Sequence, residues 1–324
     1  MRRPTTTPAP GLPQRVTIWE VGARDGLQNE PTSVPVEVKL ELLARLADAG
    51  LTVIEATSFV RPDRVPQLAD AEELMRRLPR VDGVRYPVLV PNDRGLDRAL
   101  ESGVTDVAVF ASATETFARR NINRGLDDQL DMFAPVVARA REHGLAVRGY
   151  LSMCWGDPWE GDVPVEQVVR VCSDLLALGC TSLSLGDTTG VGTPGRVTAL
   201  LSALSAAGVP TAAVGVHFHD TYGQALANTL AALQSGVTTV DSSVGGLGGC
   251  PYARSATGNL ATEDLLWMLD GLGIETGVDL DRLVETSTWL AGVLGRPSPS
   301  RVVRALSGRG PEPRTDSTSD TDKE

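Results

Sequence analysis

The chain contains Ala213-Val214-Gly215-Val216-His217-Phe218-His219-Asp220, a short apolar run that ends in two histidines one residue apart. Such a run predicts a buried strand, and because side chains alternate between the two faces of a strand, His217 and His219 would point the same way. Two imidazoles on one strand face are close enough to bind a single metal ion. A pair of buried core histidines, each with its own hydrogen-bond partner, is the alternative reading.

The same rhythm of a short β-branched run, a turn and an amphipathic stretch repeats along the chain from Val16. We expect strands at about 16–21, 52–57, 86–90, 106–111, 146–151, 182–186, 213–218 and 238–243. Helical patterns occur at about 35–49, 66–78, 94–102, 127–143, 164–178, 194–207, 222–235 and 262–270, with one more at 279–294. A glycine suited to a left-handed cap follows several of them, namely Gly50, Gly103, Gly144, Gly179, Gly208 and Gly236.

This strict alternation of strand and helix predicts an α/β fold. A closed (β/α)8 TIM barrel with a C-terminal helical extension fits better than an open doubly wound sheet, which usually has about five or six strands. We expect residues 15–297 to form this one catalytic domain. Residues 1–14, rich in Pro and Thr, predict a disordered arm, and the polar residues 298–324 predict a disordered tail.

Composition restricts the possible partners. The formal net charge of −11 makes nucleic acid and anionic membranes improbable ligands. No apolar run is long enough to span a bilayer. The four cysteines, Cys154, Cys172, Cys180 and Cys250, form no CxxC pair, and no secretory signal precedes the first predicted strand. We therefore expect free thiols in a soluble cytoplasmic protein.

Polar residues gather where the predicted strands end, which is where parallel barrels carry their catalytic groups. Arg24 and Asp25 follow the first strand, Glu55 lies in the second, and Asp187 ends the sixth. Taken singly, these residues could form a solvated turn pair, an inner-barrel salt bridge and a helix cap. Together with the two histidines, they predict an active site at one mouth of the barrel.

A divalent metal site is the specific form that we expect. Its predicted ligands are Asp25, His217, His219 and Asn259, the last of which follows the eighth strand. Oxygen and imidazole ligands without a thiolate favour Mg²⁺ or Mn²⁺ over structural zinc.

The run Gly245-Gly246-Leu247-Gly248-Gly249-Cys250 is too rich in glycine to be a strand or a helix. It could be an ordinary loop, a phosphate-binding loop, or a mobile flap that brings Cys250 over the mouth as a proton donor or nucleophile. The run lacks the Gly-Lys-Ser/Thr sequence of nucleotide-binding loops, which disfavours nucleotide triphosphate chemistry.

Four motifs, at residues 21–30 (VGARDGLQNE), 186–195 (GDTTGVGTPG), 217–225 (HFHDTYGQA) and 246–253 (GLGGCPYA), together resemble the 3-hydroxy-3-methylglutaryl-CoA lyase family. The likeness extends from about Val16 to about Ser300. The wider group comprises metal-dependent barrels that make or break carbon–carbon bonds, including isopropylmalate and homocitrate synthases.

The resemblance implies cleavage of (S)-3-hydroxy-3-methylglutaryl-CoA to acetyl-CoA and acetoacetate, through a metal-bound alkoxide and a thioester enolate. It implies that Asp25, His217, His219 and Asn259 bind the metal. Arg24 and Glu55 would be active-site groups, with Asp187 near the substrate. Cys250 would be the flap thiol, and either it or His217 would protonate the enolate. A homodimer is also implied.

One loop departs from the family pattern. Residues 151–161 carry Asp157 where the family usually has a second cysteine and Trp159 where it usually has a tyrosine. This difference leaves a related acyl-CoA lyase, acting on a similar substrate, as an alternative. A condensing synthase would share the barrel and the metal, but such synthases usually carry a longer C-terminal region. A binding barrel without activity is the remaining alternative.

Overall fold

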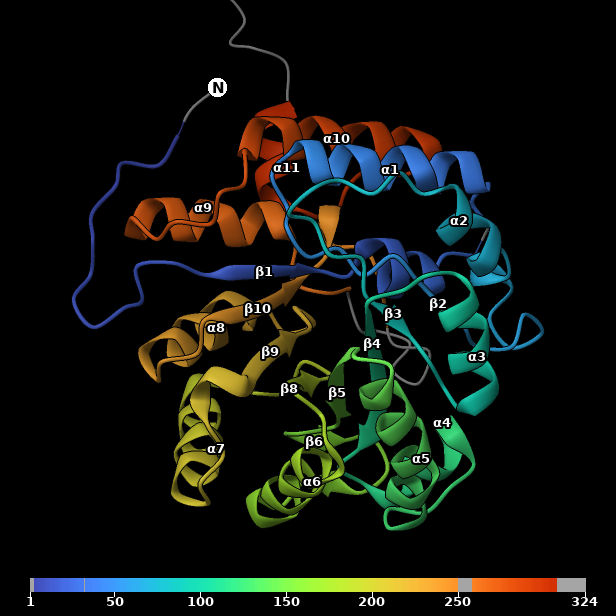
Figure 1. Cartoon of the computed structure of the whole chain (residues 1–324). Helices are drawn as coiled ribbons and strands as arrows, with labels where there is room; N and C mark the ends of the chain where they lie inside the picture. Colours follow the sequence, from blue (N-terminus) through green and yellow to red (C-terminus); the bar gives the residue numbers. More distant parts are fainter. Residues whose placement is uncertain (1–2, 32, 250–257, 308–324) are drawn as a thin grey trace, which may run out of the picture.

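The computed structural model describes residues 3–31, 33–249 and 258–307, and within them eight parallel strands form one sheet. The sheet has the order β1-β10-β9-β8-β5-β4-β3-β2 (Figure 1). Its strands are β1 (Thr17–Glu20), β2 (Thr57–Ser58), β3 (Val88–Leu89), β4 (Asp106–Ser112), β5 (Ala146–Ser152), β8 (Ser182–Asp187), β9 (Val214–Phe218) and β10 (Thr239–Ser242).

Backbone hydrogen bonds between the first and second strand regions close this sheet into a barrel. Glu20 pairs in parallel with Ile54. The N–H of Glu20 donates to the carbonyl of Val53 over 3.0 Å, and the N–H of Glu55 donates to the carbonyl of Glu20 over 2.8 Å. The predicted (β/α)8 TIM barrel is therefore confirmed. β2 and β3 are shorter than expected because much of their pairing consists of such isolated bridges.

Helices follow the strands on the outside of the barrel, most of them close to the predicted positions. They are α1 (Val36–Asp48), α2 (Ala71–Arg77), α3 (Asp93–Glu101), α4 (Glu115–Ile122), α5 (Asp128–Glu142), α6 (Val165–Leu178), α7 (Pro194–Ala206), α8 (Ala225–Gln234) and α9 (Thr262–Leu272). Short 3₁₀ turns occupy Pro66–Leu68, Thr211–Ala213 and Val244–Gly246. All six predicted capping glycines have positive φ angles, between 69° and 111°.

Two elements beside the barrel mouth were not expected. The helix α4 and the two-stranded hairpin β6 (Gly156–Asp157) and β7 (Gly161–Asp162) fill the connections after β4 and β5. A simple alternation of one strand with one helix does not predict them, because each lies inside the connection between a strand and its main helix.

The C-terminal helix α10 (Leu280–Leu294) lies along α1, as Figure 1 shows at the top of the view. Arg45 of α1 stacks on the ring of Trp289, with Cζ 4.8 Å from its centroid. Arg282 of α10 pairs with Asp48 at the end of α1. These contacts explain how the extension completes the domain beyond the eighth strand–helix unit.

The expected boundary at 298 needs correction, because helix α11 (Arg301–Ser307) lies beyond it. The Asp264 carboxylate accepts hydrogen bonds from the Ser300 hydroxyl at 2.6 Å and the Val302 N–H at 2.8 Å, and so holds the start of this helix. Val303 is buried in the hydrophobic core, where α11 packs against α9 and α10. Polar composition concealed a short helix whose start is fixed by one buried carboxylate.

The segment before β1 has no regular secondary structure, but it lies against α9. The N–H of Thr7 donates to the carbonyl of Gly271 over 2.7 Å, and Arg3 forms a salt bridge of 2.9 Å with Asp281. The expectation of a disordered arm therefore needs correction for residues 3–14. None of the helices in the described part of the chain is both long and apolar enough to cross a membrane.

Candidate active site and metal centre

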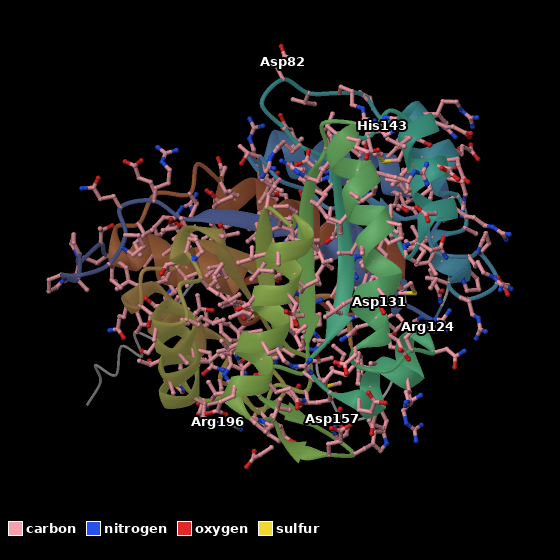
Figure 2. The ribbon with its side chains drawn as sticks, turned by 60° about the horizontal axis from the view of Figure 1, so that its bottom comes forward. Asp82, Arg124, Asp131, His143, Asp157 and Arg196 are labelled. Atoms are coloured by element: carbon pink, nitrogen blue, oxygen red, sulfur yellow. The ribbon has the colours of Figure 1, made fainter. Side chains whose placement is uncertain are left out.

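The two ends of the barrel are easily distinguished in Figure 2. Asp157, just beyond the carboxyl end of β5, and Arg196, near the start of α7, lie at the bottom of the view. Asp82, in the turn before β3, and His143, in the turn before β5, lie at the top. The third histidine is therefore at the end opposite to the site predicted from His217 and His219.

The predicted metal ligands converge at the carboxyl ends of the strands. Ligand atoms of Asp25, His217 and His219 all lie within 4.8 Å of one another. Asn259 joins them, since its Nδ2 donates to Oδ2 of Asp25 over 2.7 Å and to the carbonyl of Leu247 over 3.0 Å. All four residues predicted as ligands are thus neighbours.

The donor set fits a hard divalent cation. Nδ1 of His219 and Oδ1 of Asn259 are buried and have no hydrogen-bond partner among the described residues. Burying a polar atom without a partner costs free energy, so these two atoms are suited to bind a ligand such as a metal ion. A carboxylate, an amide oxygen and two imidazoles are all ligands that divalent metal ions accept.

A single turn of π-helix, Gly22–Gly26, positions Arg24 and Asp25. The carbonyl of Val21 accepts the N–H groups of Arg24, Asp25 and Gly26 at 3.2, 2.8 and 3.1 Å. A Cβ on Gly26 would lie 2.8 Å from Cβ of Leu247, so only glycine fits there. Such π turns occur frequently at functional sites.

Glu20 anchors this turn to the loop after β10. Its Oε1 accepts the N–H groups of Gly22 and Val244, each over 2.8 Å, and its Oε2 accepts the Thr262 hydroxyl over 2.6 Å. Burial raises the pKa of the Glu20 carboxyl to about 7, against the opposing effect of these hydrogen bonds. The carboxyl thus joins the turn that carries Asp25 to the loop after β10.

Arg24 and Glu55 form a buried ion pair, which matches the inner-barrel salt bridge given above as an alternative for Glu55. Nε of Arg24 donates to Oε1 of Glu55 over 3.0 Å, and Nη1 donates to Oδ1 of Asp25 over 2.7 Å. The hydroxyl of Tyr150 donates to Oε2 of Glu55 over 2.5 Å. The guanidinium also lies 5.5 Å from the centroid of the Tyr150 ring. One charged network therefore connects Glu55 to Asp25, a predicted metal ligand.

Asp241 of β10 supports His217 from inside the barrel. Oδ2 of Asp241 lies 3.3 Å from Nδ1 of His217 and accepts the Ser184 hydroxyl over 2.7 Å. Its Oδ1 accepts Nη2 of Arg148 over 2.6 Å. Carboxylates of this kind fix the ring orientation of metal-binding histidines.

The charges of the site perturb the three ionisable ligands. Burial by itself would raise the pKa of Asp25, but Arg24, His217 and the hydrogen bond from Asn259 outweigh it and lower that pKa. Burial would lower the pKa of His217, but Asp241 and then Asp25 raise it. Burial and the charge of His217 lower the pKa of His219 to about 4. Asp25 is therefore ionised and His219 neutral at pH 7, the forms that bind a metal.

Asp187 is placed differently from the other predicted residues. In the parallel pairing of β8 with β9, Gly186 lies opposite His217 and Asp187 lies opposite Phe218. The side chain of Phe218 faces away from the barrel interior and packs against Trp155. Oδ2 of Asp187 accepts the N–H of Gly192 over 2.9 Å. Burial raises the pKa of this carboxyl to about 6. Asp187 therefore anchors the loop before α7.

The unusual loop after β5 is tightly bound to α4. Oδ2 of Asp157 accepts the Thr114 hydroxyl over 2.6 Å, and Oδ1 accepts the N–H groups of Trp159 and Glu160 at 2.7 and 2.9 Å. Arg120 stacks on the ring of Trp159, with Cζ 4.4 Å from its centroid. Asp157 and Trp159 thus take part in a local network at the active-site end.

The glycine-rich run passes close to two of the predicted metal ligands, Asp25 and Asn259. A Cβ on Gly248 would lie 2.5 Å from Nδ2 of Asn259 and 3.6 Å from Oδ2 of Asp25, and its φ of 114° also requires glycine. Cys250 lies outside the described residues.

Sequence reasoning missed three functional neighbours, Glu20, Tyr150 and Asp241. A usable signal was present, because strand alternation places Asp241 on the same face as Thr239, and Tyr150 on the same face as Arg148. Asp241 also pairs in register with His217. A polar residue on an inward strand position was the clue for Tyr150 and Asp241, whereas Glu20 lies on the opposite face of β1, together with Ile18.

Comparison with known proteins agrees with this geometry. Residues 15–290 match the family model described as HMGL-like. The chain is 50% identical over 305 residues to the mitochondrial hydroxymethylglutaryl-CoA lyase of Rattus norvegicus, and the aligned region covers 94% of each chain.

Solved structures give the same result. The hydroxymethylglutaryl-CoA lyase of Pseudomonas aeruginosa superimposes with a TM-score of 0.89 at 49% identity, over 92% of this chain and 99% of the other. An HMG-CoA lyase of Acinetobacter baumannii, solved in complex with coenzyme A and 3-methylmalate, gives 0.88 at 34% identity, over 95% and 100% of the two chains. The chain therefore belongs to the HMGL-like family, and within that family to the hydroxymethylglutaryl-CoA lyases.

Proposed function

We propose that this protein cleaves (S)-3-hydroxy-3-methylglutaryl-CoA to acetyl-CoA and acetoacetate with a divalent cation, Mg²⁺ or Mn²⁺. The observation that carries the proposal is the convergence of Asp25, His217 and His219 within 4.8 Å, beside the buried Arg24–Glu55 pair. Family membership supplies the substrate class.

Four residues would hold the cation: Asp25, His217, His219 and Asn259. When bound, a divalent cation supplies the Lewis acidity that lowers the pKa of a ligated hydroxyl and favours loss of its proton. The ionised Asp25 contributes negative charge to the site, while Asn259 offers its buried, unpaired Oδ1.

Arg24 is suited to stabilise the thioester enolate that carbon–carbon cleavage leaves. Its guanidinium keeps its charge, because Glu55 and Asp25 raise its pKa more than burial lowers it. The pair with Glu55 fixes Nε and the link to Asp25 fixes Nη1, so the fork is held in place before the substrate binds. Such preorganised charge acts where negative charge develops.

The last step delivers a proton to the enolate carbon. His217 lies beside Asp241 and Cys250 follows the glycine-rich run, so both are candidates, and the flap role of Cys250 rests on the sequence resemblance. Asp187 holds the loop before α7, from which we infer that it shapes the substrate pocket.

A related acyl-CoA lyase reaction is the second candidate function. Asp157 and Trp159 replace the residues usual in the family and are bound to α4 through Thr114 and Arg120. A changed loop at the active-site end favours a substrate that differs in its acyl group.

One assay separates these possibilities. The purified protein is incubated with hydroxymethylglutaryl-CoA, with and without EDTA, and acetoacetate and acetyl-CoA are both quantified. Equimolar products that disappear with EDTA and return with Mg²⁺ or Mn²⁺ support the proposal. Activity only with homologous 3-hydroxyacyl-CoA thioesters supports the second function. Condensation of acetyl-CoA with a 2-oxo acid would instead identify a synthase.

We also infer a homodimer that works in the cytoplasm. The described cysteines, Cys154, Cys172 and Cys180, are free thiols, which suits a reducing compartment. Light scattering coupled to size-exclusion chromatography tests the dimer, and a mass of one chain would contradict it.

A further inference from the structure

A cavity of about 260 Å³ lies at the end of the barrel opposite to the metal site. Its wall includes residues that begin the strands, such as Thr17 of β1, Asp106 of β4 and Thr239 of β10. This is the end of the barrel at which Asp82 and His143 lie in Figure 2. The cavity contains none of the residues assigned to the reaction.

Two buried donors in its wall have no acceptor. Nε1 of Trp19 and Nε of Arg148 lack a hydrogen-bond partner within the described ranges, although the two residues are only 5% and 2% exposed. The Arg148 guanidinium stacks 3.9 Å from the centroid of the Trp19 ring. An unpaired buried N–H costs free energy, so two of them beside one cavity indicate an acceptor inside it.

Space for the guanidinium comes from a missing side chain. A Cβ on Gly215, which also lines the cavity, would lie 2.7 Å from Nη2 of Arg148. Nη2 is used by Asp241, so Nε is the atom left free toward another acceptor. The guanidinium is therefore a built part of this wall.

The remaining polar groups favour an anion. Arg85 lines the cavity with its side chain 48% exposed and forms a 2.7 Å salt bridge with Asp106, which uses only one of its nitrogens. Thr17, Ser182 and Thr239, which carry hydroxyls, also line the wall. The unpaired groups of this wall among the described residues, Nε1 of Trp19 and Nε of Arg148, are both donors, so a carboxylate, which only accepts hydrogen bonds, satisfies them better than a cation does.

We propose that this cavity binds a small carboxylate anion, whose oxygens accept hydrogen bonds from Nε1 of Trp19 and Nε of Arg148 while Arg85 pairs with it at the rim. The volume suits a short aliphatic acid. The site is separate from the metal centre, to which Arg148 connects it through Asp241.

The test uses the full-length chain carrying His217→Ala, in EDTA, so that carboxylate binding at the metal centre is suppressed. Equilibrium dialysis with labelled acetate measures the stoichiometry and Kd, and acetamide serves as the neutral control of the same shape. We expect one acetate per chain and no saturable binding of acetamide. The indole N–H signal of Trp19, assigned by its loss in Trp19→Phe, should shift during the acetate titration.

Variants locate the binding. Trp19→Phe keeps the ring but removes the donor and should weaken acetate binding about tenfold, the effect of losing one hydrogen bond to a charged group. Trp155→Phe is the matched control, because Trp155 also has a buried Nε1 without a partner among the described residues but does not line the cavity. Its Kd should not change.

Two results would overturn the proposal. One is the absence of saturable acetate binding, which would leave the cavity to water. The other is an equal Kd in the parent, Trp19→Phe and Arg85→Ala. If Trp19→Phe does not fold, as judged by circular dichroism, the half-exposed Arg85→Ala decides alone, with an expected loss of several-fold in affinity.

Discussion

Arg24 and Glu55 form a two-point ion pair at the mouth of the barrel. Nε of Arg24 lies 3.0 Å from Oε1 of Glu55, and Nη2 of Arg24 lies 3.3 Å from Oε2 of Glu55. Both side chains are buried, at 7% and 0% exposure. Removing one partner of such a pair leaves an uncompensated buried charge and costs about 3–5 kcal/mol. A conservative change is therefore needed to test catalysis rather than folding.

Arg24→Lys keeps the charge but loses the planar fork. We expect kcat to fall about 100-fold or more while KM changes little, because negative charge on the thioester oxygen develops only as the bond breaks. Steady-state kinetics with hydroxymethylglutaryl-CoA measures both constants. Arg45→Lys, which alters a stacked arginine between α1 and α10, is the control and should leave kcat unchanged. A raised KM with normal kcat would make Arg24 a binding residue.

The metal cluster predicts a strict dependence on a divalent cation. His217→Ala or Asp25→Asn should lower turnover by several orders of magnitude and reduce bound metal, while the circular dichroism spectrum stays that of the folded protein. Elemental analysis of dialysed protein gives the metal content. His143→Ala at the other end of the barrel is the matched histidine control. Full activity after exhaustive chelation would refute the assignment.

Asp241→Asn tests the support of His217. The change keeps the shape but removes the charge that faces Nδ1 of His217, so metal affinity should fall about 10- to 100-fold. Metal titration by isothermal calorimetry measures the loss. Asp106→Asn is the control, since Asp106 is also buried beside an arginine, Arg85, but at the opposite end. Equal metal affinity in both variants would show that Asp241 serves only the barrel interior.

How much of this site was readable from the sequence follows from the periodicity of its parts. The (β/α)8 order and the histidine pair could be predicted because strands alternate side chains and parallel barrels place chemistry at their carboxyl ends. The proximity of Asp25 to Asn259, 234 residues apart in sequence, follows from barrel closure. That both residues bind a metal stays a prediction.

Other features depend on contacts that no local pattern encodes. The π turn at Gly22–Gly26 forms because the carbonyl of Val21 accepts three N–H groups, and helical periodicity does not report that. Asp187 follows Gly186, which faces the barrel interior, so the side chain of Asp187 faces the other way. Its carboxylate therefore bonds to Gly192 in the loop before α7. The helix α11 depends on one carboxylate, Asp264, of another helix.

A buried carboxyl beside this site predicts a pH-dependent stability. Burial raises the pKa of Glu263 to about 8, and its two oxygens accept the N–H of Gly245 at 3.0 and 2.9 Å. Because the folded pKa is above the unfolded value of 4.5, the folded state binds this proton more tightly. The stability from Glu263 is complete below pH 4.5 and is lost as the pH rises toward 8.

Glu263→Gln should remove that dependence. Between pH 5 and 8, the free energy of unfolding of the wild type should fall relative to the variant by up to about 1.4 kcal/mol per pH unit. Urea unfolding at several pH values measures this difference. Glu275→Gln changes a carboxyl that is 69% exposed and should run parallel to the wild type. Parallel curves for Glu263→Gln as well would show that the Glu263 pKa is not raised.

Burial of three thiols bears on which cysteine reacts. Cys154, Cys172 and Cys180 are buried, and burial raises the pKa of Cys172 and Cys180 to about 12 and that of Cys154 well above its usual value. Buried thiols with raised pKa values react slowly with alkylating agents, since the thiolate is the nucleophile. We therefore predict that iodoacetamide modifies Cys250 first, and that substrate or a substrate analogue protects it.

Activity should fall in step with the labelling of Cys250, and Cys250→Ser should lose most of its activity with little change in stability. Peptide mass spectrometry of partly alkylated protein assigns the modified residue, and Cys172→Ser is the control that should retain both activity and sensitivity to iodoacetamide. Cys154 is the informative competitor, because its Sγ donates to the carbonyl of Leu151 over 3.1 Å at the end of β5, just before the unusual loop. Inactivation that follows modification of Cys154 while Cys250 stays unlabelled would move the reactive thiol to that loop and refute the flap assignment.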